Sequence, residues 1–209
     1  MSATPIYKNR YNISDMKRYA IILSLFNLAW SIAAWTYDWP KLIETPIYIW
    51  PVMLICPIYP LLLADIWIRI FTGQKQNQII FSLGILGSVV YGVAAIIYYP
   101  YYMTVFGFDW LTFGAIGWVL AYGGQGLYFL FKKMPKTALW PWIIASVYLL
   151  IKTYFDFKYK TFGYLINYDI DPNALIILSC CVAIITVAWT GLIIRRQLEY
   201  QESSTLHSL

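Results

Sequence analysis

Six long apolar segments constrain this chain more than any other feature. They run over about 19–37, 46–71, 79–99, 111–131, 138–156 and 174–194. Each is close to the roughly 20 residues that a helix needs to cross the hydrocarbon core of a bilayer. The chain is 60% hydrophobic and only 12% charged, against about 25% charged in soluble domains. The sequence therefore predicts an all-α fold, a polytopic membrane bundle of six transmembrane helices.

The connections between these segments are short and leave little room for a soluble catalytic domain. We expect three parts: a basic cytoplasmic segment over 1–18, the six-helix bundle over 19–196, and a polar cytoplasmic tail over 197–209. The predicted location is the cell membrane, with several passes.

Basic residues alternate along the connections. They precede the first segment, fill the second and fourth connections, and follow the last segment: Lys8, Arg10, Lys17, Arg18, Arg69, Lys75, Lys132, Lys133, Lys136, Arg195 and Arg196. The first, third and fifth connections are neutral or mixed in charge. Cytoplasmic loops carry the excess of Lys and Arg, so both termini are predicted to be cytoplasmic (N-in and C-in).

Aromatic residues gather where these segments end. Examples are Trp35, Tyr37, Trp39, Tyr98, Tyr99, Tyr101 and Tyr102 at the expected outer interface, and Trp140 and Trp142 at the inner one. Rings of this kind settle at the depth of the lipid headgroups, which agrees with the predicted topology.

The sequence predicts membrane lipids as partners, together with partner membrane subunits, and it leaves the oligomeric state open. Nucleic acid is excluded, because the basic residues lie between apolar segments and form no stripe on a soluble surface. The single histidine is His207, and the three cysteines show no metal-binding spacing. No metal or cofactor is predicted.

Small and polar residues recur at helical spacing and predict where helices pack closely. The sets are Gly84, Ser88 and Gly92 in the third segment, Gly117, Ala121 and Gln125 in the fourth, and Ser24, Asn27, Ser31 and Ala34 in the first. Small residues allow helix backbones to approach one another in a membrane. Gln125 and Asn27 are interpreted as interhelical hydrogen-bond partners, and the glycines around Gln125 alternatively leave space for a ligand.

The second segment contains Pro51, Pro57 and Pro60. A proline inside a helix removes one hydrogen bond and frees a carbonyl group. The stretch 56–60 is therefore predicted to be kinked or locally unwound, either to fit helix packing or to border a cavity.

Two pairs of opposite charges lie within the apolar segments, each with four-residue spacing. Asp65 precedes Arg69, and Lys152 precedes Asp156. A charge in the bilayer centre is costly and marks a functional site by default. The competing interpretation is that the Asp65 pair reaches the inner interface and that Lys152 extends outward to the outer one.

Four tyrosines in different segments are candidates to line an aromatic pocket for a flat or isoprenoid ligand. The predicted ligand-binding residues are Tyr59, Asp65, Tyr91, Tyr122, Gln125, Tyr148 and Lys152. Asp65 and Asp156 are the candidate catalytic carboxylates.

A set of motifs between Leu25 and about Gly163 resembles the YpjA-like family, prokaryotic integral membrane proteins of unknown function. The motifs are Trp35-Thr-Tyr-Asp-Trp39, Thr45-Pro-Ile-Tyr48, the prolines Pro57 and Pro60, Gln125-Gly-Leu-Tyr128, and the acidic Asp156. The resemblance implies the architecture of the bundle, since the activity of that family is itself unsettled.

The chain departs from this family at polar positions. It has Ile58 and Tyr59 where the family carries an acid between the prolines. It has Ile151, Lys152 and Thr153 where the family places His and Asp before the final acid. Most of the family's acidic and histidine positions are therefore missing.

Three functional classes fit these observations. The first is a membrane protein without catalytic chemistry of its own, either an accessory subunit of a membrane complex or a binder of a small amphipathic, lipid-like ligand. The second is a membrane enzyme that uses a carboxylate as acid and base on a lipid or isoprenoid. The third is a transporter of small solutes. The scarcity of catalytic side chains favours the first class.

Overall fold

The computed structural model describes residues 13–44, 46–50, 55–108, 110–132, 137–159 and 172–206. Its long helices are α1 (Ile13–Leu42), α3 (Ile55–Thr72), α4 (Gln78–Phe106), α5 (Trp110–Lys132), α6 (Trp140–Tyr159) and α7 (Pro172–Leu206). A short 3₁₀ helix, η1 (Ile47–Ile49), follows α1. The described ranges contain no β-strand, so the predicted all-α class is confirmed.

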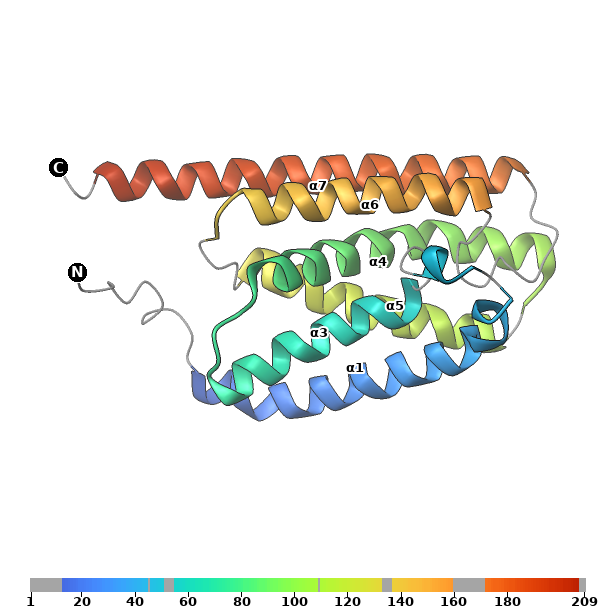
Figure 1. The fold of residues 1–209 in the computed structure, drawn as a ribbon, viewed down its shortest axis with the longest axis horizontal. Coiled ribbons are helices and arrows are strands. Elements are labelled where there is room, and N and C mark those ends of the chain that lie inside the picture. Colours follow the sequence, from blue (N-terminus) through green and yellow to red (C-terminus); the bar gives the residue numbers. More distant parts are fainter. Residues whose placement is uncertain are drawn as a thin grey trace.

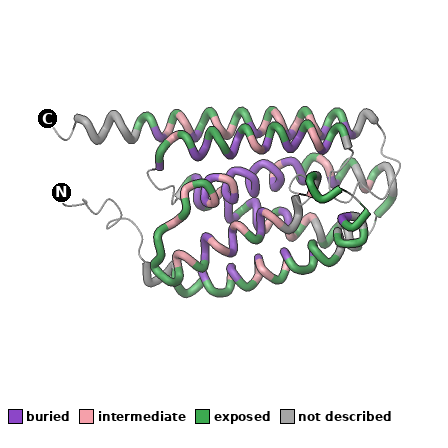
Figure 2. Tube along the Cα trace, in the orientation of Figure 1, coloured by how far each residue is buried: buried purple, intermediate pink, exposed green. Residues whose placement is uncertain are grey.

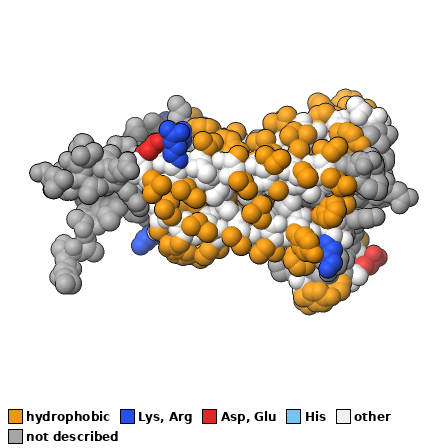
Figure 3. Space-filling model, turned by 90° about the horizontal axis from the view of Figure 1, so that it is seen from above, with side chains coloured by type: hydrophobic (Ala, Val, Ile, Leu, Met, Phe, Trp, Pro, Cys, Tyr) orange, Lys and Arg blue, Asp and Glu red, His pale blue; other side chains and the backbone are white. Residues whose placement is uncertain are grey.

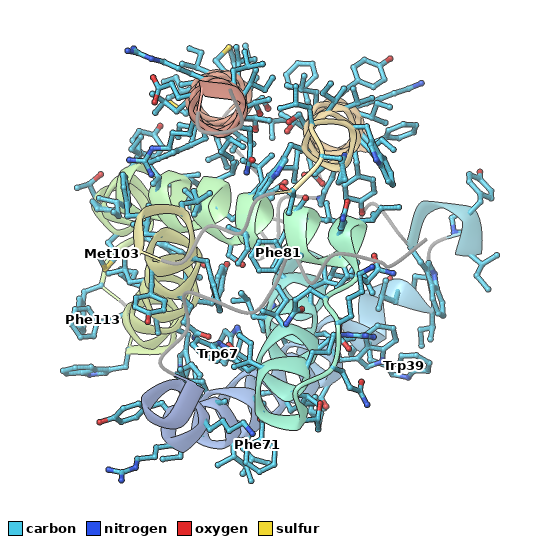
Figure 4. The ribbon with its side chains drawn as sticks, turned by 90° about the vertical axis from the view of Figure 1, so that its left-hand side faces the viewer. Trp39, Trp67, Phe71, Phe81, Met103 and Phe113 are labelled. Carbon is cyan, nitrogen blue, oxygen red and sulfur yellow. The ribbon has the colours of Figure 1, made fainter. Side chains whose placement is uncertain are left out.

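The helices lie side by side along the long axis of the molecule (Figure 1). Seen from one end, α6 and α7 form one layer, α4 and α5 the next, and α1 and α3 the third (Figure 4). Helix α4 packs against α3, α5, α6 and α7, whereas α1 packs mainly against α3. Burial follows this arrangement, because buried residues concentrate along the middle layer (Figure 2). Helix α4 is therefore the centre of the bundle.

Three helices are long and apolar enough to cross a membrane among the described residues, over Lys17–Thr36, Gln78–Tyr101 and Leu175–Glu199. In the central Gln78–Tyr101 segment, 72% of the most apolar stretch is buried, against 22% in Leu175–Glu199. The apolar side chains of α7 thus face outward. Figure 3 shows hydrophobic side chains across the middle of the α6–α7 face, with charged ones toward its two ends.

Each of the six predicted segments falls on a helix, although the boundaries differ. The second segment was expected from position 46, whereas α3 begins at Ile55. Helix α7 extends through the predicted polar tail as far as Leu206. The basic residues at positions 8, 10, 133 and 136, the acids at 169 and 171, and Pro51 lie outside the described residues.

The proline-rich stretch of α3 is helical. Residues 55–60 belong to the continuous helix Ile55–Thr72, with Pro60 inside it. Pro57 lies in the first turn, where the missing N–H would have no partner within the helix. The backbone is therefore not unwound over the described part of this stretch.

The connection between α3 and α4 shows why α4 begins where it does. Gly73 adopts a φ of 73°, a conformation that glycine adopts without steric cost. The Asn77 side chain then accepts hydrogen bonds from the N–H groups of Ile79 and Ile80, at 3.0 and 3.2 Å. This arrangement is a helix N-cap, which satisfies two donors that lack partners within the helix.

Small residues bring α4 close to both of its neighbours. A Cβ added to Gly123 would lie 2.8 Å from the Cα of Gly92. A Cβ on Gly84 would lie 3.0 Å from the Cβ of Leu62 in α3. The stripe predicted for the third segment is thus a packing face, as expected. In the fourth segment Gly117 makes no such close approach, because a Cβ there meets nothing within 4 Å, and Gly123 makes it instead.

Adjacent glycines in α5 provide a matched test of this packing. We expect Gly123→Ala to lower the stability of the protein by about 1–3 kcal/mol, since the new methyl group meets backbone atoms that have no room to move. Gly124→Ala should instead be neutral or raise stability by up to about 1 kcal/mol, because a Cβ there meets nothing within 4 Å and alanine favours the helix. Thermal unfolding in mild detergent measures both variants, and effects of the same sign would contradict this packing.

Candidate functional site

A buried ion pair lies in α6. The Nζ atom of Lys152 is 2.7 Å from the Oδ2 atom of Asp156. The two side chains are 1% and 0% exposed. Among the Lys, Arg, Asp and Glu side chains whose burial the structure describes, they are the only buried ones. The alternative interpretation that Lys152 extends outward is therefore wrong, because its buried ammonium group is paired with the carboxylate.

The four-residue spacing explains why the two groups meet, since residues i and i+4 share one face of a helix. That face is directed at the centre of the bundle, where α6 packs on α4. Two charges removed from water lose several kcal/mol of hydration each, and their attraction repays this loss only with good geometry and further hydrogen bonds. The surroundings of the pair therefore matter as much as the pair itself.

Tyrosines from α4 and α3 supply part of these surroundings. The Tyr91 hydroxyl donates to the Oδ2 atom of Asp156 at 3.4 Å. The Nζ atom of Lys152 lies 5.6 Å from the centre of the Tyr91 ring, within the range of a cation–π interaction. The Tyr59 ring stacks on the Tyr91 ring, with ring centres 5.2 Å apart and planes at 26°.

Two further tyrosines complete this group. Tyr122 of α5 and Tyr148 of α6 lie within electrostatic range of the Tyr59 hydroxyl, and Tyr148 also interacts with Asp156. Tyr122 is buried, while Tyr148 is only half-buried and reaches the surface. We call these residues the tyrosine–ion-pair cluster: Tyr59, Tyr91, Tyr122, Tyr148, Lys152 and Asp156. It unites all four tyrosines that the sequence analysis selected as candidates for a pocket.

The Tyr59 hydroxyl is the unusual member of the cluster. Its side chain is 1% exposed. Tyr91 is a close polar neighbour, yet no described group meets the geometry of a hydrogen bond with this hydroxyl. A buried polar group without a partner costs about 1–3 kcal/mol, and few occur in native proteins.

Asp65 lies apart from this cluster. Its Oδ2 atom accepts a hydrogen bond from the Nε atom of Arg69 at 2.7 Å, and the side chains of Asp65 and Arg69 are 35% and 28% exposed. Arg69 also donates to the carbonyl oxygen of Lys75 in the α3–α4 connection. The geometry favours the interpretation of Asp65 as part of an interfacial pair over its role as a catalytic carboxylate.

Gln125 belongs to a second buried group. Its Oε1 atom accepts from the Nδ2 atom of Asn27 at 2.7 Å and from the Nε1 atom of Trp67 at 2.8 Å. Its own amide donates to Asn27 and to the carbonyl oxygen of Ala121. These bonds join α1, α3 and α5, so the predicted role of Gln125 and Asn27 in interhelical hydrogen bonding is confirmed.

Trp67 is a member of this group that was not predicted from the sequence. Figure 4 places Trp67 and Phe81 in the interior of the bundle, whereas Phe113 lies at its periphery, in agreement with exposed fractions of 3%, 3% and 52%. A tryptophan in an apolar segment gives no signal in the sequence that its indole N–H has a partner. Only the positions of Asn27 and Gln125 reveal it.

Trp142 corrects a further prediction. It was assigned to the inner aromatic belt, but its side chain is fully buried, and its Nε1 atom donates to the hydroxyl of Thr137 at 2.6 Å. The Nε2 atom of Gln197 reaches the same hydroxyl at 3.4 Å. The Thr137 hydroxyl therefore ties the start of α6 to α7. Its neighbour Trp140 is 50% exposed, as an interfacial residue should be.

No protein-family model, curated protein or solved structure matches this chain. The chemistry of the site is therefore argued from its own geometry. The cluster combines one positive charge, one negative charge and several hydroxyl groups in an apolar interior. Such a group can bind and orient a polar atom that water does not reach.

Proposed function

We propose that the chain is a six-span membrane protein with both termini in the cytoplasm. Six long helices run back and forth, and the described chain ends, Ile13 and Leu206, lie at the same end of the bundle (Figure 1). Basic residues also lie near that end, in the first turns of α1, in the last turn of α3 and the connection after it, and late in α7. They are Lys17, Arg18, Arg69, Lys75, Arg195 and Arg196. This distribution supports an N-in, C-in orientation in the cell membrane.

Reporter fusions test this topology. Green fluorescent protein fused after Leu209 should fluoresce, since that end is proposed to be cytoplasmic. Alkaline phosphatase fused after Phe108, between α4 and α5, should be active, because it folds only outside. Green fluorescent protein fused after Gly73, in the α3–α4 connection, is the control for a cytoplasmic connection. It should fluoresce, as it does after Leu209. Phosphatase activity after Leu209 would contradict the proposal.

We further propose that this protein binds a small amphipathic, lipid-like ligand at the tyrosine–ion-pair cluster. One observation carries the proposal: a fully buried acid and base form a pair in the same cluster as a buried hydroxyl without a hydrogen-bond partner. Replacing a buried ion pair by apolar residues is often neutral or stabilising. A buried pair beside an unsatisfied hydroxyl therefore supports a binding site more than a packing role.

The position of the cluster agrees with this role. It combines residues of α3, α4, α5 and α6, close to the centre of the bundle. Ligand sites in helix bundles are built from side chains of facing helices. The half-buried Tyr148 extends from the cluster to the apolar surface of α6, which supports access for a ligand from the surrounding lipid.

The resemblance to the YpjA-like family fits the same proposal. Asp156 is the acid that this chain shares with the family motifs, and it is the carboxylate of the buried pair. Membership of this family is itself proposed on the motifs alone. Partner membrane subunits are compatible with the exposed apolar faces of α1 and α7.

Mass spectrometry of co-purified lipids tests ligand binding. We expect the protein, purified in mild detergent, to retain one defined lipid-like molecule. The double variant Lys152→Met with Asp156→Asn should lose at least 90% of it, because the pair that holds Tyr91, and through its ring Tyr59, in the cluster is gone. The matched control is Arg69→Met with Asp65→Asn, which removes an exposed pair of the same spacing and should retain the ligand.

Thermal unfolding of the same samples separates binding from folding. The proposal expects the Lys152 and Asp156 double variant to stay folded and monodisperse while it loses the ligand. Retention of the ligand by this folded double variant, or absence of a defined molecule from the unchanged protein, would overturn it.

A further inference from the structure

The position of the Tyr59 ring is fixed from two sides. The ring stacks on Tyr91, and it lies directly against the backbone of Gly87, where an added Cβ would be 2.1 Å from its Cε1 atom. Only glycine leaves room for the ring at this point of α4. The hydroxyl of Tyr59 is therefore held in place and does not move freely in search of a partner.

The hydroxyl held in this way has no hydrogen bond among the described residues. Every buried polar group in an apolar interior needs a partner, because no bulk water is at hand. A phenolic hydroxyl both donates and accepts hydrogen bonds. The missing partner is thus a single polar atom, and either a hydroxyl or a carbonyl group would provide it.

The charge of the cluster decides which head group fits beside Tyr59. Lys152 and Asp156 neutralise each other at 2.7 Å, and none of the other charged side chains whose burial is described is buried. An anionic head group would have to compete with Asp156 for the ammonium group, and a cationic one would compete with Lys152 for the carboxylate. A neutral head group leaves the pair intact and avoids the desolvation of a further charge.

We infer that the ligand is a neutral amphipathic molecule with a hydroxyl or carbonyl head group, which hydrogen-bonds to the Tyr59 hydroxyl and leaves the Lys152–Asp156 pair in place. Its chain extends past Tyr148 toward the surrounding lipid, since Tyr148 links the buried cluster to the surface. This inference rests on the proposed ligand site and adds the chemical class of the ligand.

Three probes with the same chain and different head groups test the inference. They are dodecanol, dodecanoate and dodecylamine, each titrated into the protein in nanodiscs of zwitterionic lipid. Thermal unfolding is followed by tryptophan fluorescence. We expect dodecanol to raise the Tm in a saturable manner and the two charged probes to have no saturable effect.

A single-atom change identifies the hydroxyl. Tyr59→Phe should weaken dodecanol binding about three- to tenfold, the loss expected for one neutral hydrogen bond. Without a probe the same variant should unfold at the original Tm or above it, because it removes a buried hydroxyl that has no partner. Tyr154→Phe is the matched control, since this tyrosine of α6 is 59% exposed, and its binding should not change.

The outcomes separate the head-group class from the ligand site. Saturable binding of a charged probe in preference to dodecanol, or no binding of any probe, overturns the neutral head group. So does equal dodecanol binding by the Tyr59 and Tyr154 variants. The ligand site itself is tested separately. It requires that the double variant without the buried charges loses the co-purified molecule.

Discussion

Polar groups inside this bundle have to find their partners within the protein, because the apolar interior and surface offer no water to replace them. Much of the described interior follows this rule, whereas a few buried groups, the Tyr59 hydroxyl among them, have no hydrogen-bond partner there. The hydroxyl groups of Ser146 and Thr190 lie 2.6 Å apart between α6 and α7. Gln125 joins three helices through its amide. Lys152 and Asp156 hold opposite charges together in the same way. These internal contacts, added to close packing, determine which faces of the helices meet.

Close packing around α4 is the second condition for the site. Gly92 and Gly123 let α4 and α5 approach at backbone distance, and Gly87 makes room for the ring of Tyr59. Because the same helix carries Tyr91, the position of α4 also sets the distance between the Tyr91 hydroxyl and Asp156. Packing and site therefore share one helix, and a larger residue at Gly87 would affect both.

Much of this arrangement can be predicted from the sequence, because long apolar segments and small residues at helical spacing depend on local order alone. The six helices, the packing stripe of Gly84, Ser88 and Gly92, and the choice of four tyrosines all follow from such patterns. The side-chain contacts that could not be predicted depend on which face each helix turns toward its neighbours. Lys152 can extend outward or inward from the same position, and only the place of α4 decides that it turns inward.

The same reason explains the other corrections. Trp142 and Trp140 are two residues apart and alike in the sequence, yet they lie on different sides of α6, so that one is buried and the other 50% exposed. In the same way, Gly123 and Gly117 lie on different faces of α5, so that only Gly123 closely approaches α4. Tyr59 gives no sign in the sequence that its hydroxyl lacks a partner, since this follows from contacts between α3 and α4.

A double-mutant cycle on Lys152 and Asp156 tests the central claim most directly, namely that these two groups are paired in the interior. Thermal unfolding would be measured for Lys152→Met, Asp156→Asn and the double variant in the same lipid nanodiscs. We expect each single variant to lose about 3–5 kcal/mol, since it leaves one buried charge alone, and the double variant to lose much less than either. Losses that simply add would contradict the account.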